Sequence, residues 1–227
     1  MKLKKIALLL VMFCMGTAFA QDQEGVSERY ADLEKDKSGF KETWVLPGAD
    51  FTKYNKLYIW KAEFQFRDVG PAQRTRMTRM STRKTEFGIS DKDREEFQRI
   101  VREAFLKEIQ QGKNFELVDV DGVDQHTLIM RGAVLDIISH VPPDTIGRSE
   151  IYLSSIGEAT LVMELVDAAT GNVVALVAER RHLQRSSTRD LGVMPTNTAT
   201  IVADLRGWAR RAAKTLRTEL DKAIAGK

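Results

Sequence analysis

The chain has 227 residues, with 35 lysines and arginines against 32 aspartates and glutamates and a formal net charge of +3. Hydrophobic residues make up 43% and charged residues 30% of the chain, a composition that excludes a disordered protein and indicates one ordinary domain. The first 20 residues contain three lysines and no acidic residue, so the rest of the chain is electrically balanced. This balance disfavours nucleic-acid binding driven by overall charge.

The first 20 residues have the pattern of a signal peptide. Three lysines precede an apolar run of ten residues, Ile6 to Met15, and Ala18-Phe19-Ala20 supplies the small residues of a cleavage site. The apolar run is too short to cross a bilayer, which takes about 20 residues, and no later stretch approaches that length. We therefore expect a periplasmic or secreted protein that begins at Gln21 and has no transmembrane segment.

Cys14 is the only cysteine, and it lies within the segment that we expect to be removed. A mature chain without cysteine has no disulfide, no thiol chemistry and no cysteine-ligated zinc. The alternative is a lipoprotein acylated at Cys14. That alternative is disfavoured because Phe13 stands where a small residue should precede the modified cysteine.

Residues 21–55 read as an N-terminal arm followed by an extended segment. Residues 21–37 are polar and acidic, which is typical of a loose arm. Residues 38–55 contain two glycines and Pro47, which argue against a helix. Phe40, Trp44 and Phe51 in this segment indicate that it packs against an apolar surface.

A domain is predicted over residues 56–227. It opens with a strand from Leu57 to Phe66, in which Trp60, Phe64 and Phe66 alternate with polar residues. Residues 67–88 have no clear period and form a basic loop. A helix follows, capped by Ser90 and ended by Gly112.

Four strands and a helix complete this domain. The strands are expected at 115–120, 128–141, 151–166 and 173–183, with a Thr170-Gly171-Asn172 turn before the last of them. Gly157 suggests a bulge, and a long helix begins near Thr200. The order β-α-β-β-β-β-α predicts an α+β two-layer sandwich, with a mixed, mostly antiparallel sheet of about five strands and both helices on one face.

Two helices on one face leave the other face of that sheet to be explained. The strand at 128–138 is apolar on both sides, which is normal for a strand covered on both sides. We expect the segment that holds Phe40, Trp44 and Phe51 to cover the second face. A second copy of the chain, forming a homodimer, is the alternative.

No sequence motif for catalysis or metal binding is convincing. Ser81 to Lys84 fits a short serine-enzyme pattern, but the companion motif is misplaced. His126, His140 and His182 show no paired spacing for zinc, and the aspartates between 119 and 124 fit a turn better than a calcium loop. We therefore predict no catalytic residue, no metal and no cofactor.

A cluster of basic residues stands out in the loop at 67–88. Its members are Arg74, Arg76, Arg79, Arg83 and Lys84, with no acidic residue among them. The cluster reads either as a solvated loop or as a contact surface, and outside the cytoplasm such a surface would contact an acidic envelope protein or polymer and not nucleic acid. A second basic ridge on the last helix, Arg206, Arg210, Lys214 and Arg217, reads as a solvated face.

Two stretches resemble a known family. Residues 38–54 contain Ser38-Gly39-Phe40 and Pro47-Gly48-Ala49-Asp50, and residues 158–181 contain Asp167-x-x-Thr170-Gly171 before a strand that ends in Arg-Arg. Together they resemble a family of bacterial envelope proteins, many of them lipoproteins, whose domain has no known function. The resemblance covers residues 38–225, but the basic segment 67–88 looks like an addition. It implies an envelope setting and assigns no catalytic residue.

The function expected from the sequence is that of a non-enzymatic interaction or accessory module of the periplasm. One alternative is an accessory protein that binds a small ligand or lipid. Another is a hydrolase with an unrecognised site. A deep pocket with histidines and carboxylates would favour the hydrolase, whereas an apolar cleft would favour ligand binding.

Overall fold

The computed structural model describes residues 29–69, 86–142, 152–184 and 196–226. The chain divides into two compact units, Met1–Asp32 and Leu33–Lys227. Only residues 29–32 of the first unit are described, and residues 30–32 form a turn. The second unit contains the sheet and also includes residues 33–55. No helix within the described ranges combines the length and the hydropathy needed to cross a membrane.

Seven strands form one sheet in the described part of the chain, in the order β1-β2-β7-β6-β5-β3-β4. β3 pairs in parallel with β4 and β5, whereas β5, β6 and β7 form an antiparallel meander. The prediction of an α+β fold with a mixed, mostly antiparallel sheet is confirmed. The strand bounds are β1 Glu34–Asp36, β2 Glu42–Val45, β3 Lys56–Phe66, β4 Glu116–Val118, β5 Thr127–Ser139, β6 Ser155–Asp167 and β7 Val173–Gln184.

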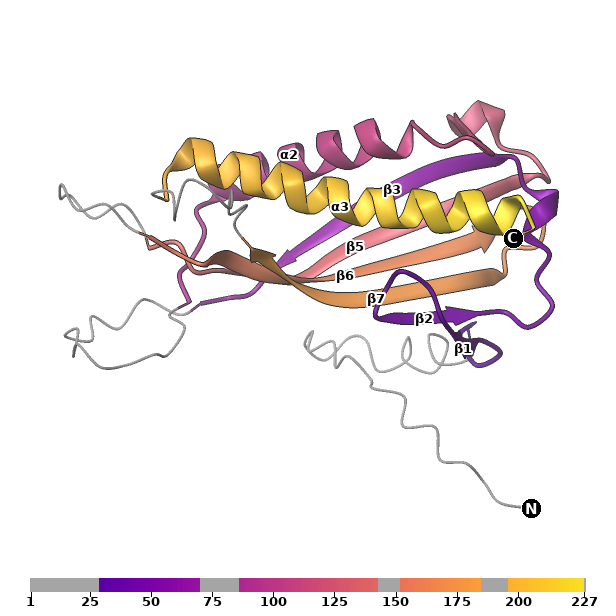
Figure 1. Cartoon of the computed structure of the whole chain (residues 1–227), viewed down its shortest axis with the longest axis horizontal. Helices are drawn as coiled ribbons and strands as arrows, with labels where there is room; N and C mark the ends of the chain where they lie inside the picture. The colour runs from indigo at the N-terminus through magenta and orange to yellow at the C-terminus, as the bar shows by residue number, and fades with distance from the viewer. Residues whose placement is uncertain (1–28, 70–85, 143–151, 185–195, 227) are drawn as a thin grey trace, which may run out of the picture. The chain divides into compact units, whose positions relative to one another are not determined.

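Helices α2 (Asp91–Ile109) and α3 (Thr198–Ile224) cover one face of the sheet (Figure 1). Ser90 caps α2 by accepting a hydrogen bond from the Asp93 amide, as predicted. Asn197 caps α3 in a reciprocal arrangement with Thr200. Phe97 of α2 packs edge-on against Phe64 and Phe66 of β3, and Trp208 of α3 is buried in the same core.

Two irregularities in the strand pairing change which face of the sheet the following side chains point to. The pairing of β3 with β5 slips between Ile59 and Ala62, so Ile59 packs toward the helices while Trp60 is 53% exposed. The prediction that Trp60 shares a face with Phe64 is therefore wrong, because a bulge interrupts the alternation. A second shift, at Asp136, brings Ile137 into the core, whereas simple alternation placed it on the opposite face.

The N-terminal segment joins the sheet at its edge and does not lie across it. β2 pairs antiparallel with β7, and β1 pairs with β2, which adds two strands to the number expected. Phe40 is buried in the helix-side core, and Phe51, in a 3-10 turn, packs against that core beside Tyr54. The expectation that Phe40, Trp44 and Phe51 together cover the second face differs from this arrangement. Only Trp44, in register with Leu176, occupies a sheet position.

Candidate functional site

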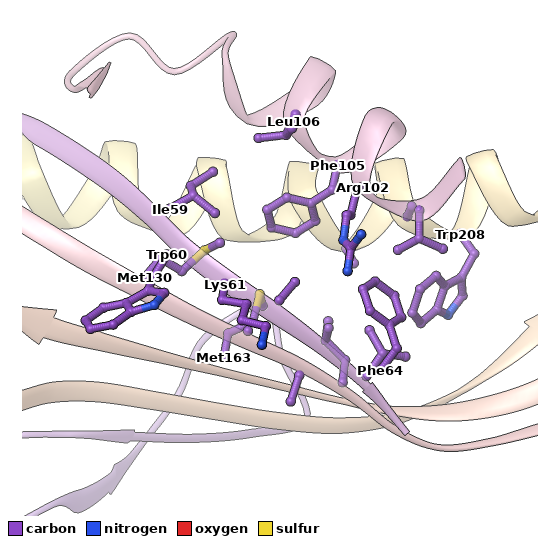
Figure 2. A pocket seen from close by; sticks show the side chains of 18 residues that line it. Ile59, Trp60, Lys61, Phe64, Arg102, Phe105, Leu106, Met130, Met163 and Trp208 are labelled. Atoms are coloured by element: carbon purple, nitrogen blue, oxygen red, sulfur yellow. The ribbon is translucent and has the colours of Figure 1, made fainter. Parts of the chain in front are cut away.

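A cavity lies between the two helices and the sheet. It has a volume of about 440 Å³ and receives side chains from α2, α3, β3, β5 and β6. This volume falls within the range of small-molecule sites, roughly 300–1,000 Å³. Figure 2 shows Phe105 and Arg102 reaching from α2 toward β3, with Trp60 and Trp208 at opposite ends of the group. The wall is formed largely by Ile59, Phe64, Phe105, Met130, Leu161 and Met163.

Small residues on three elements keep the space open. Gly132 of β5, Ala62 of β3 and Ala212 of α3 all line the cavity. A Cβ atom built on Gly132 would meet no atom within 4 Å, which places empty space directly over this strand. Protein interiors normally close such space because each lost contact reduces dispersion energy. The cavity therefore costs stability, and its apolar wall suits an apolar ligand.

Two large apolar residues of the lining are exposed. Trp60 is 53% exposed and Leu106 is 41% exposed, and they belong to β3 and α2 respectively. The guanidinium of Arg131, on the neighbouring strand, lies 4.9 Å from the centre of the Trp60 ring and supports it. Because Arg131 alternates with Met130 and Gly132 of the cavity wall, the Trp60 ring lies over the sheet face turned away from the helices, and Leu106 is the exposed apolar residue on the helix side.

Two cationic residues also belong to the lining. Lys61 and Arg102 are exposed lining residues, and the Arg102 guanidinium lies 5.0 Å from the centre of the Phe64 ring. Arg102 also donates a hydrogen bond to Gln98 at 3.3 Å. Neither cation pairs with a carboxylate in the described part of the chain, whereas Arg99, one turn away, is held by Glu96 and Glu103.

One polar atom of the lining is buried without a partner. Trp208 is 2% exposed, and its indole Nε1–H has no acceptor among the described residues. A buried N–H that loses its hydrogen bond costs about 1–3 kcal/mol. An oxygen atom on a bound molecule would remove that cost. In the sequence Trp208 is one apolar residue of the long last helix, and Gly132, a glycine inside a strand, is the one local signal of the cavity.

The basic loop predicted as a contact surface lies outside the described residues, including Arg74, Arg76, Arg79, Arg83 and Lys84. The basic ridge of α3 is only partly solvated. Arg217 is 14% exposed and binds Glu108 of α2 at 3.2 Å, while Arg210 is largely exposed. This pairing holds the two helices together, so the prediction of a wholly solvated ridge is wrong.

The predicted turn residues have structural roles. Asp119 accepts a hydrogen bond from the Gly122 amide, and Asp124 pairs with Lys56 at 2.6 Å, which lowers the pKa of Asp124 to about 2. His126 bonds to the Lys53 carbonyl, and His182 lies 3.1 Å from Glu158. The described residues hold no group of three or more histidine, cysteine or acidic side chains arranged for a metal.

The two sequence stretches that carry the family resemblance meet in space. Asp167 of the D-x-x-T-G motif receives a hydrogen bond from Lys53 at 2.8 Å and another from the Ala169 amide at 2.8 Å. Gly171 has a φ of +74°, which glycine adopts without strain. Burial alone raises the pKa of Asp167, but the bonds from Lys53, Ala169 and Tyr54 outweigh it and hold the pKa below its usual value. Both stretches therefore stabilise the fold.

A charged network surrounds the bulge in β5. Asp136 has a φ of +51°, and its carboxylate accepts two hydrogen bonds from Arg67, at 2.7 and 2.6 Å, and one from Arg180 at 2.6 Å. Arg67 also binds Glu86 at 2.8 Å. The network therefore ties Arg67 and Glu86, which are 19 positions apart in the sequence, to the same point of β5.

We expect the replacement Asp136→Asn to lower the free energy of unfolding by about 1 kcal/mol at neutral pH, because the pair is partly exposed. Asp136→Ala should lose about 1 kcal/mol more than Asp136→Gly, since alanine is strained at positive φ.

The bonds from Arg67 hold the pKa of Asp136 below its usual value despite burial. Its stabilisation is therefore present above the unfolded pKa of about 3.9 and is lost as the pH falls through the folded pKa. Urea unfolding of the unmodified protein and of Asp136→Asn from pH 7 to pH 3 measures this loss. A stability difference between the two proteins that stays constant with pH would contradict the prediction.

Comparison with known proteins gives a family without an activity. A model of the family described as "Protein of unknown function (DUF3313)" matches residues 22–212. No curated protein matches. A DUF330 protein from Xanthomonas campestris is 11% identical, with a TM-score of 0.44, covering 76% of this chain and 87% of that one. The PelC dodecamer from Paraburkholderia phytofirmans is 7% identical, with a TM-score of 0.36 and coverage of 82% and 96%. Since the family model spans most of its length, the chain belongs to the DUF3313 family of proteins of unknown function.

Proposed function

We propose that this protein is an exported, non-enzymatic accessory protein of the bacterial envelope that binds an apolar small molecule in the cavity between α2, α3 and the sheet. The cavity is the observation that carries the proposal, because it is apolar and of ligand size. The signal-peptide pattern at residues 1–20 supports export.

The two other readings of the sequence have less support. Recognition of an acidic partner depends on the basic loop, whose residues lie outside the described structure. A hydrolase needs polar groups that converge in a pocket. The cavity wall is mainly hydrocarbon and includes none of the three histidines. Ligand binding is therefore the function that we favour.

Filling the cavity tests this proposal with a variant that should fold well. A valine at position 132 would place its side chain in the empty space over β5. We expect Gly132→Val to weaken binding of the neutral fluorophore N-phenylnaphthylamine by about tenfold or more, and to raise stability by about 1 kcal/mol. Fluorescence titration and thermal unfolding of the full mature chain measure the two effects.

Gly88→Val is the matched control, since Gly88 is exposed, lies outside the cavity and also has open space around its Cβ position. This control should bind the fluorophore as the unmodified protein does. Equal binding by Gly132→Val and the unmodified protein would show that the fluorophore sits elsewhere and would overturn the proposal. Absence of any binding by the unmodified protein would do the same.

A further inference from the structure

The outer surface of the helix layer carries a row of cations on α3. Arg206, Arg210 and Lys214 follow one another at intervals of four residues, so they lie on one side of the helix. All three are exposed, and Arg211 beside them is exposed as well. These four residues form the α3 row. Residues 205–218 of the helix contain no acidic residue, so the row presents uncompensated positive charge along this length.

The acidic side chains of α2 do not neutralise the α3 row. Glu108 is buried and binds Arg217 at 3.2 Å, and its other oxygen approaches Arg210 only to 3.9 Å. Two further acids of α2 are held by Arg99 of the same helix. In the part of the chain that the structure describes, the other three cations of the row form no ion pair. They therefore remain available to a negatively charged partner.

An exposed apolar residue lies beside the α3 row. Leu106 of α2 is 41% exposed and stands two positions before Glu108, the residue that contacts α3. Figure 1 shows α2 and α3 side by side, and Figure 2 shows Leu106 on the far side of Phe105 from Met163 of the sheet. Leu106 therefore belongs to the outer surface of the helix layer, where Lys107 adds another exposed cation.

We propose that this outer surface of the helix layer docks on an anionic phospholipid bilayer, with the α3 row against the phosphates of the head groups and Leu106 among them. Cations that repeat along one side of a rigid helix lie in a line, which matches a plane of negative charge. Cations beside an exposed leucine are the combination that proteins lying on a membrane surface use. A soluble acidic partner would use the same cations but would leave Leu106 without a role.

Sedimentation of the mature chain with vesicles tests the proposal. The protein should bind phosphatidylcholine vesicles that contain phosphatidylglycerol and should not bind phosphatidylcholine alone, and added salt should release it. Each Lys or Arg near an anionic surface contributes about 1 kcal/mol, or about fivefold in binding, so Arg206→Gln/Lys214→Gln should weaken binding about 25-fold. These two substitutions spare the contacts of Glu108, and thermal unfolding should show an unchanged stability.

Single lysine variants give a matched comparison. Lys214→Gln should weaken binding to the anionic vesicles about fivefold. Lys61→Gln removes the same charge from β3, where Lys61 is exposed outside the helix layer, and should bind as the unmodified protein does. Leu106→Ser should weaken binding about threefold at low and at high salt alike, because burial of apolar surface is not screened.

Three outcomes would overturn the inference. The first is absence of binding to phosphatidylglycerol vesicles at low salt. The second is equal binding by Arg206→Gln/Lys214→Gln and the unmodified protein. The third is binding to soluble polyglutamate that is as tight as binding to the vesicles, with no effect of Leu106→Ser, which would assign the row to an acidic macromolecule. Gly132→Val should bind vesicles normally, so this test and that of the cavity fail independently.

Discussion

Replacing Lys53 with methionine should lower the free energy of unfolding by about 2–3 kcal/mol at neutral pH, the value typical of a lost hydrogen bond to a charged group. The reason is an asymmetry of burial. The side chain of Asp167 is 4% exposed, whereas that of Lys53 is 43% exposed. Removal of the lysine leaves a buried carboxylate without its cation, while removal of the carboxylate leaves a lysine that can reach water.

Asp167→Asn should therefore cost less, about 1 kcal/mol, because asparagine can still accept the bond from the Ala169 amide. The double variant Lys53→Met/Asp167→Asn should be close in stability to the single Asp167→Asn. Urea unfolding of the unmodified protein and the three variants completes this double-mutant cycle. If Lys53→Met and Asp167→Asn cost the same, the buried carboxylate is not the source of the effect.

The pH dependence has a definite sign. The pKa of Asp167 in the folded protein is below its usual value, so its stabilisation is present above the unfolded pKa of about 3.9 and is lost as the pH falls through the folded value. Without Lys53, burial dominates and raises the pKa of Asp167. The stability difference between the unmodified protein and Lys53→Met should therefore shrink on acidification, and a difference that grows would contradict the argument.

Alanine at position 157 should be more damaging still. A Cβ atom built on Gly157 lies 2.1 Å from the carbonyl oxygen of Ile138, a backbone atom of the paired strand. Relief of this overlap requires β5 and β6 to separate, which breaks ladder hydrogen bonds at the irregular end of their pairing. We expect a loss of about 3 kcal/mol or more, measured by thermal and urea unfolding.

Gly132→Ala is the matched control for this prediction. Both glycines lie in central strands of the same sheet, and neither has a positive φ, but the Cβ position of Gly132 is open. The control should be as stable as the unmodified protein or slightly more stable, since alanine also narrows the unfolded ensemble. Equal stabilities of Gly157→Ala and Gly132→Ala would show that the two strands separate without cost at this point.

The sequence predicts most of the fold because its signals are local. Ser90 before two aspartates marks a helix start, and Asp167-x-x-Thr170-Gly171 marks a hairpin, and the structure has both. β1 is not predictable in this way, since its three residues are all charged and become a strand only through pairing with β2. The face of Trp60 is missed because a bulge depends on the register with β5, and the sequence of β3 does not contain that register.

The cavity is harder to predict than the fold because it is made of missing atoms. Gly132, Ala62 and Ala212 are unremarkable within their own elements, and only the packing of α3 against the sheet brings them to the same space. The cationic residues of its lining, Lys61 and Arg102, come from β3 and α2, and no spacing in the sequence relates them. Paired charges could not be told from unpaired ones either, as the contact of Arg217 with Glu108 shows.

The pairing of β2 with β7 also determines when, during synthesis, the sheet can be completed. Val45 finds its partner in Ala175, near the other end of the chain. At a synthesis rate of about 5–20 residues per second, the first strands wait on the order of ten seconds before the residues they pair with exist. The N-terminal region is made first, but β2 cannot take its place in the sheet until β7 has been made.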